Sequence, residues 1–150
     1  MTLTRLMVGL FLVVLLIAAG SAYAEGGAKI AIGQTRINSH ESMGEIGYER
    51  NDWEVNLGVI GQGYADDQVV TYGISKIVRP HWKLLGGTNY YRIGVARVTG
   101  SPLVGPYNFR LGVGLDWNIV VLEYFHYSSA GIYKPNKGID GVMLRMHLPY

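Results

Sequence analysis

The chain has 150 residues, no cysteine and a formal net charge of +2. This length predicts a single domain, and so small a charge argues against nucleic acid as a partner. Disulfides are excluded, so a small exported domain would need another source of stability, such as the closed backbone pairing of a β-barrel in a bilayer.

The first 24 residues have the features of a secretory signal peptide. Arg5 supplies a positive charge, Leu6 to Ala19 form an apolar core, and Ala22 to Ala24 offer a small-x-small cleavage site. The alternative is a membrane anchor, but the apolar run is short for a membrane helix and the cleavage site argues against it. We therefore expect a signal peptide over 1–24 and a mature domain over 25–150.

The rest of the chain shows short runs of alternating apolar and polar residues separated by turn residues, which indicate β-strands. The clearest run is Trp53 to Gly61, where Trp53 and Val55 alternate with Glu54 and Asn56. The run from Trp82 to Val98 places Lys83 and Arg92 on opposite faces, which predicts a bulge near Gly86 or a polar end that leaves the membrane. The expected strands cover 28–37, 43–50, 53–61, 68–78, 82–98 and 107–115, and the last two form a hairpin over 122–150.

These eight strands carry an apolar face opposite a polar one, which predicts an all-β fold: an eight-stranded antiparallel transmembrane β-barrel of the outer membrane. Short connections alternate with long ones, so we expect short turns on the periplasmic side and the long loop Ser129 to Ile139 outside the cell. The three tryptophans each follow a short turn and predict an aromatic girdle at the periplasmic interface. We expect the interior to hold a hydrogen-bonded network of Glu45, Glu49, Glu54, Glu123, Arg145 and His147.

His126, Ser128 and Asp140 are expected to meet at the outer end of the final hairpin, on its lipid-facing side. Residues two apart on a strand share a face and are separated by about 6.6 Å. A serine hydroxyl needs a base to remove its proton, and an acid to orient that base. Singly, each residue also suits a rim or turn position. Polar, ionisable groups that face lipid are costly, however, and so indicate a functional site.

The stretch FHYSSAGI at 125–132, followed by KPN at 134–136 and GID at 138–140, resembles the signature of the lipid A 3-O-deacylase (PagL-type) family. The close likeness covers the last quarter of the chain, and the signal peptide and strand pattern extend it. The resemblance implies a lipid-facing triad in which Ser128 attacks, His126 is the base and Asp140 is the acid. It also implies an oxyanion hole formed by the Gly131 N–H and the Asn136 amide.

Two positions depart from the family pattern. The acid is usually glutamate but here is Asp140, whose shorter reach could weaken its contact with His126. The residue after the serine is usually asparagine but here is Ser129.

The expected function is hydrolysis of the ester-linked 3-hydroxyacyl chain at the 3 position of lipid A, through an acyl-enzyme. The expected partners are lipid A in the outer leaflet and the outer membrane itself, without nucleic acid, metal or cofactor, and a homodimer is left open. Two alternatives remain: a non-catalytic structural or adhesive barrel with a decayed triad, or an esterase that acts on other outer-leaflet lipids.

Overall fold

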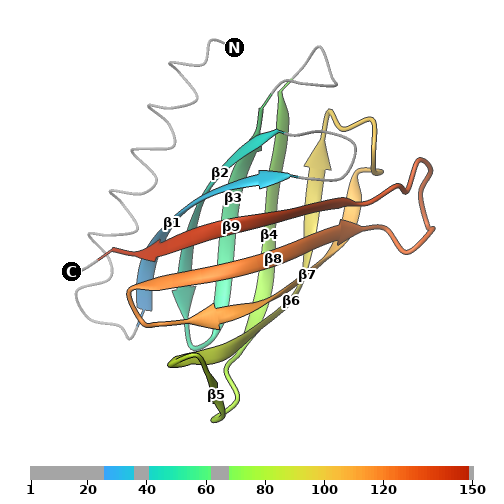
Figure 1. Cartoon of the computed structure of the whole chain (residues 1–150). Coiled ribbons are helices and arrows are strands. Elements are labelled where there is room, and N and C mark those ends of the chain that lie inside the picture. The colour runs from blue at the N-terminus through green and yellow to red at the C-terminus, as the bar shows by residue number, and fades with distance from the viewer. Residues whose placement is uncertain (1–25, 36–40, 62–67, 149–150) are drawn as a thin grey trace.

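In the computed structural model, the described residues are 26–35, 41–61 and 68–148 (Figure 1). They form nine strands: β1 (Gly26–Thr35), β2 (Ser42–Arg50), β3 (Trp53–Ile60), β4 (Val69–Val78), β5 (Lys83–Leu84), β6 (Gly87–Thr99), β7 (Tyr107–Asp116), β8 (Val120–Ser128) and β9 (Ile139–His147). The expected signal peptide lies outside the described residues. Within the described ranges, no helix is long and apolar enough to cross a membrane.

Eight long strands close into an antiparallel barrel. Consecutive strands pair with one another, in the order β4-β3-β2-β1-β9-β8-β7-β6. The barrel closes because β4 pairs with β6, through partners such as Thr71 and Val98. The first and last strands, β1 and β9, also pair directly. Figure 1 shows the resulting closed wall, and the predicted eight-stranded barrel is confirmed.

The fifth expected strand differs from the prediction. The chain turns back on itself at Leu85 and Gly86, whose φ angles are 51° and 78°. Two successive positive φ angles are the geometry of a tight type I′ hairpin turn, so β5 pairs with the start of β6. This small hairpin projects from the bottom of the barrel in Figure 1. Of the two expected alternatives, the bulge is absent at this described position, and the polar start of the run, with Lys83, instead forms a hairpin that projects beyond the barrel wall.

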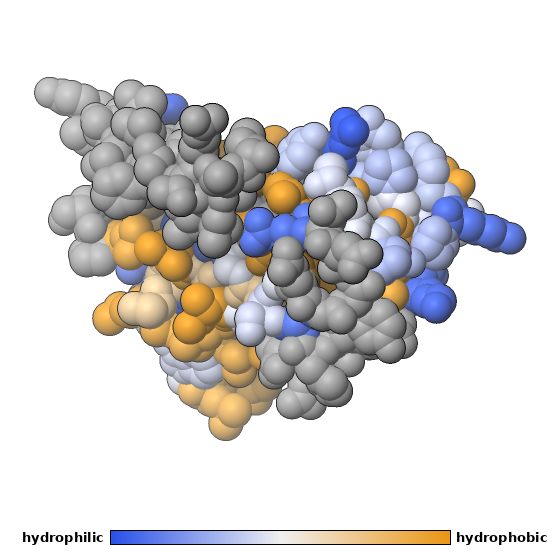
Figure 2. Space-filling model, turned by 90° about the horizontal axis from the view of Figure 1, so that it is seen from above, coloured by the Kyte–Doolittle hydropathy of each residue, from blue (hydrophilic) through white to orange (hydrophobic). Residues whose placement is uncertain are grey.

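The outer wall of the barrel is apolar and its interior is polar. Along β9, for example, Val142 and Leu144 are exposed while Met143 and Arg145 are buried. In the view from above, apolar residues gather at the lower left of the visible face and polar residues at the upper right (Figure 2). An apolar exterior around a polar interior is the architecture of an outer-membrane β-barrel.

A charge network fills the middle of the barrel. Arg92 lies 2.9 Å from both Glu54 and Glu123, and Arg110 lies 2.7 Å from Glu45. Arg145 contacts all three glutamates, at 2.5 Å for Glu45 and 3.4 Å for Glu123. Three guanidinium groups thus balance three carboxylates whose side chains are fully buried, which is the condition under which buried charges are tolerated.

A second network of ion pairs lies toward the short-turn end. Arg79 bridges Glu49 at 2.7 Å and Asp116 at 2.9 Å, and Lys29 contacts Glu49 as well. His147 lines the same cavity, which has a volume of about 540 Å³. The expected interior positions of the acidic residues and Arg145 are confirmed, whereas Lys29, Arg92 and Arg110 were not predicted.

The three tryptophans lie at the short-turn end and expose 52, 55 and 38% of their surface for Trp53, Trp82 and Trp117. Trp117 lies in the turn between β7 and β8, so the alternation of side chains along a strand does not determine where its indole ring points. Its indole N–H donates to the carbonyl of Leu85 at 3.2 Å, which ties this turn to the β5–β6 hairpin. Exposed tryptophans gathered at one end are typical of a membrane-interface girdle.

Candidate active site

The register of β8 and β9 places His126 directly opposite Asp140. Both residues share the outward face with Tyr124 and Val142, which are 47 and 40% exposed. Ser128 ends β8 on that same face and opens the loop 129–138. The three candidate side chains therefore originate on the lipid-facing wall, at the end of the barrel that carries this loop.

His126 and Asp140 form a direct contact, with 2.8 Å between Nδ1 and Oδ1. A carboxylate only accepts hydrogen bonds, so Nδ1 carries the proton in this pair. Nε2 is then the nitrogen that can accept a proton. The contact has an ordinary hydrogen-bond length despite the short aspartate side chain, because directly paired residues bring their Cβ atoms to about 5 Å.

Ser128 is directed toward the loop. Its hydroxyl donates to Asn136 Oδ1 at 3.2 Å and accepts from the Ala130 N–H at 3.2 Å. Among the described residues, these are its hydrogen bonds, and neither of them joins Ser128 to His126. The structure thus brings His126 and Asp140 together and leaves the serine beside them, two positions along the strand. Catalytic hydrogen bonds are often long or misaligned in enzymes without substrate.

Asn136 is held with its amide oxygen toward the end of β8. The Ser129 N–H donates to Oδ1 at 2.8 Å, and Ser129 Oγ lies 3.0 Å from the same atom. A backbone N–H can only donate, so this contact fixes which end of the amide is oxygen. The three contacts at Oδ1 do not involve the Nδ2 group, which makes no hydrogen bond to any residue that the structure describes.

Ser129 organises the loop at the position where the family usually has asparagine. It is 1% exposed, and its hydroxyl accepts from the Tyr133 N–H at 3.2 Å. The far side of the loop is tied to the preceding loop, because Lys137 N donates to Leu103 O at 2.8 Å and Asn136 bridges to Val104. This loop is therefore anchored at both ends, and Asn136 has a defined place in it.

Gly131 occupies the tip of a tight turn beside Ser128. Ile132 N donates to Ser129 O at 3.0 Å, and the two central residues, Ala130 and Gly131, have φ angles of 51° and 84°. A non-glycine residue with positive φ is uncommon and often marks a functional site. Within the described chain, the Gly131 N–H makes no hydrogen bond. It is thus an unused donor next to the serine.

Gly138 packs against the imidazole. Its φ is 79°, and a Cβ placed on it would lie 2.9 Å from His126 Cε1 and 3.5 Å from Asp140 Oδ2. Sequence reasoning did not single out this residue, because only the fold brings the end of the loop onto the ring. The absence of a side chain here leaves room for the histidine in its observed position.

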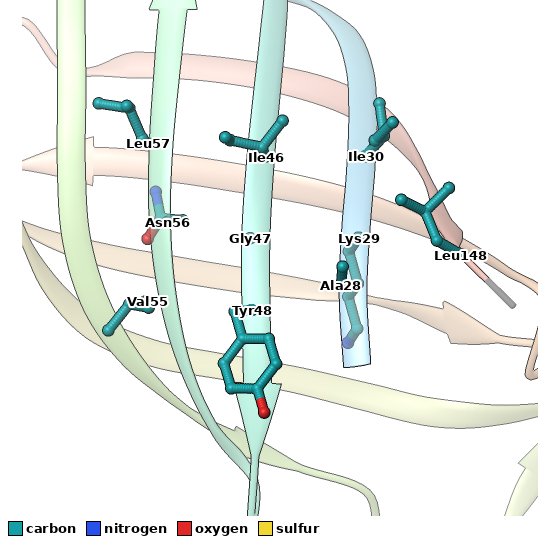
Figure 3. A pocket seen from close by; sticks show the side chains of 10 residues that line it. All are labelled: Ala28, Lys29, Ile30, Ile46, Gly47, Tyr48, Val55, Asn56, Leu57 and Leu148. Carbon is teal, nitrogen blue, oxygen red and sulfur yellow. The ribbon is translucent and has the colours of Figure 1, made fainter. Parts of the chain in front are cut away.

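Two grooves mark the outer wall. An open groove of about 850 Å³ lies beside the candidate site, and Leu122, Val142 and Leu144 of the same hairpin face contribute to it. A smaller groove of about 140 Å³ lies over β1 to β3 and is lined by side chains such as Ile46, Tyr48 and Leu57 (Figure 3). No candidate site residue lines either groove, and the larger one comes near the site through Val142, the neighbour of Asp140 on the outward face of β9.

The described residues hold no group of three or more His, Cys, Asp or Glu side chains that could bind a metal ion. The candidate site itself presents hydroxyl, imidazole, carboxylate and amide groups.

The fold is that of an outer-membrane β-barrel, and the outward face of its last hairpin carries a histidine, a serine and an aspartate. The chain matches the lipid A 3-O-deacylase (PagL) family over residues 44–149, which is more than half of its length. It belongs to that family. Among curated proteins, no sequence matches the chain significantly.

The fold is also similar to a solved structure, described as the crystal structure of the outer membrane enzyme PagL. The two share 20% sequence identity with a TM-score of 0.63, and the match covers 82% of this chain and 99% of that chain. At this identity the likeness supports the barrel fold and assigns no role to individual residues.

Proposed function

We propose that this protein hydrolyses the ester-linked 3-hydroxyacyl chain at the 3 position of lipid A, in the outer leaflet of the outer membrane. Membership of the deacylase family supports the reaction and the substrate. The observation that carries the serine-esterase mechanism is the 2.8 Å contact of His126 with Asp140 beside Ser128, on a wall that faces lipid.

In the proposed first step, Ser128 Oγ attacks the ester carbonyl while His126 Nε2 takes its proton. For this, the hydroxyl must give up its hydrogen bond to Asn136 Oδ1 and turn to the imidazole. The resulting imidazolium is stabilised by Asp140, which already contacts Nδ1. The imidazolium then returns the proton to the sugar oxygen as the ester bond breaks, which leaves the acyl chain on Ser128.

Two donors are suited to the negative oxygen that forms during the attack. The Gly131 N–H is free among the described residues, and the Asn136 amide turns its oxygen inward, which leaves Nδ2 to donate. Preorganised donors of this kind stabilise charge that develops only in the transition state. A water molecule, deprotonated by His126, then attacks the acyl carbon; the bond to Ser128 Oγ breaks, the imidazolium returns the proton to Oγ, and the 3-hydroxy fatty acid is released.

The position of the site suits a lipid substrate. The wall beside it holds the apolar groove that includes Leu122, Val142 and Leu144, which can take up hydrocarbon. The ester bonds of lipid A lie near the boundary between sugar and hydrocarbon, at the level where the outer loops begin. Substrate can thus arrive by diffusion in the leaflet, without entering the filled interior.

The proposal is tested by mixing purified, folded protein with lipopolysaccharide and weighing the lipid A products by mass spectrometry. We expect the loss of one 3-hydroxyacyl chain with the wild type. Ser128→Ala should lower the rate at least a thousandfold, because the nucleophile is gone. Thr88→Val, which removes a hydroxyl at the short-turn end of the barrel, should retain activity.

One observation favours a second candidate, a non-catalytic barrel with a decayed triad: the Ser128 hydroxyl bonds to the loop and not to His126. Intact lipid A after incubation with folded wild type, together with no cleavage of a chromogenic ester, would support this candidate. Cleavage of the chromogenic ester without loss of a chain from lipopolysaccharide would instead indicate an esterase for other outer-leaflet lipids.

A further inference from the structure

The Tyr124 hydroxyl donates a hydrogen bond to Asp140 Oδ1, the same oxygen that His126 Nδ1 contacts. Tyr124 lies on β8 opposite Val142, so it is the diagonal neighbour of Asp140 on the outward face. Diagonal neighbours on antiparallel strands lie within reach of aromatic side chains. Because an ionised carboxylate can only accept, the phenol is the donor in this contact.

This hydrogen bond pairs two polar groups, the Tyr124 hydroxyl and the Asp140 carboxylate, which would be energetically unfavourable without a partner on a lipid-facing wall. Tyr124 is 47% exposed and Asp140 only 6%, so the ring lies toward lipid while its hydroxyl reaches a nearly buried carboxylate. A hydroxyl in hydrocarbon is unfavourable without a partner, and a buried carboxylate even more so. Hydrogen bonds to a charged acceptor are stronger than neutral ones.

We propose that Tyr124 is a positioning residue for the deacylation reaction, and this inference rests on the proposed function. The imidazole alone would allow the Asp140 carboxylate to rotate and present either oxygen. The phenol holds Oδ1 in place and, through it, keeps the His126 ring oriented with Nε2 available to Ser128. The Asp140 carboxylate is thereby held by two hydrogen bonds, one from the His126 imidazole and one from the Tyr124 phenol, and both of these residues lie on β8.

The test is the activity of Tyr124→Phe, which removes one hydroxyl and keeps the ring. We expect kcat on lipopolysaccharide in mixed micelles to fall about tenfold, because a misaligned base costs rate, while KM stays within about twofold. A purely structural role would lower the folded fraction and leave kcat per folded molecule unchanged, so rates are normalised to the heat-modifiable folded band on electrophoresis. Tyr72→Phe, at another exposed wall tyrosine, is the matched control and should match the wild type.

A second measurement tests whether the effect of the Tyr124 hydroxyl on kcat requires the Asp140 carboxylate. In an Asp140→Asn background, Tyr124→Phe should have no further effect on kcat, since residues that act through one another are not additive. An active wild type whose Tyr124→Phe variant keeps the full kcat overturns this inference alone, as does a full additional loss in the Asp140→Asn background. A folded but inactive wild type overturns the proposed function, and this inference with it.

Discussion

At the scale of single residues, the candidate site depends on Gly138, where a side chain would collide with the His126 ring. A Cβ on Gly138 would come within 2.9 Å of the His126 ring, closer than side-chain carbons normally approach. We expect Gly138→Ala to displace the imidazole and to lower kcat by about a hundredfold, since a shift of about 1 Å can cost that much. The measurement is deacylation rate per folded molecule.

Backbone strain must be separated from this clash, because an L residue at positive φ costs about 1–2 kcal/mol wherever it lies. Gly86 provides the control: its φ of 78° matches the 79° of Gly138, but a Cβ there would meet nothing within 4 Å. Gly86→Ala should lose similar stability and keep full activity. Equal activity in the two variants would show that the ring tolerates a methyl group at 138.

At the scale of the hairpin, the register between β8 and β9 decides how long the acid must be. His126 lies directly opposite Asp140, and their contact of 2.8 Å leaves no gap for another methylene to fill. We therefore expect Asp140→Glu, which installs the family's usual acid, to lower kcat about tenfold by pushing the carboxylate past Nδ1. Steady-state kinetics on lipopolysaccharide would measure this, with Asp140→Asn as the reference for a lost charge. A faster Asp140→Glu enzyme would contradict the inferred fit.

The same hairpin illustrates what could be predicted from the sequence. Alternation along β8 and β9 placed His126, Ser128 and Asp140 on one outward face, because side-chain direction in a strand follows parity. The alternation of side chains along one strand does not give the register between two strands, so the contact of Tyr124 with Asp140 could not be predicted. Loop contacts such as those of Asn136 depend on turns whose φ angles local patterns do not specify. Its proposed role therefore came from resemblance alone.

At the scale of the whole molecule, the barrel is held by its closed wall and by the charges inside it. Alternation predicted the acidic residues of β2, β3 and β8 as interior groups. The cations Arg92 and Arg110 were not predicted. Arg92 lies in β6, whose pattern is irregular, whereas the regular alternation of β7 already places Arg110 opposite its apolar face. The structure supplies one buried arginine for each of Glu45, Glu54 and Glu123, so these six groups balance in charge and each depends on several others.

This dependence predicts a large effect for the removal of one interior charge. Glu54 contacts Arg92 at 2.9 Å, Lys29 at 3.6 Å and also Arg145, and its side chain is fully buried. Glu54→Gln should destabilise the barrel by about 3–5 kcal/mol, because it leaves buried cations without a carboxylate partner. Asp52→Asn makes the same chemical change in an exposed turn, where Asp52 pairs with Lys76 at 3.4 Å, and should cost about 0–1 kcal/mol. Urea unfolding in lipid vesicles, followed by tryptophan fluorescence, compares the two. Equal midpoints would mean that the interior charges do not act as one network and that the closed wall alone accounts for the stability of the barrel.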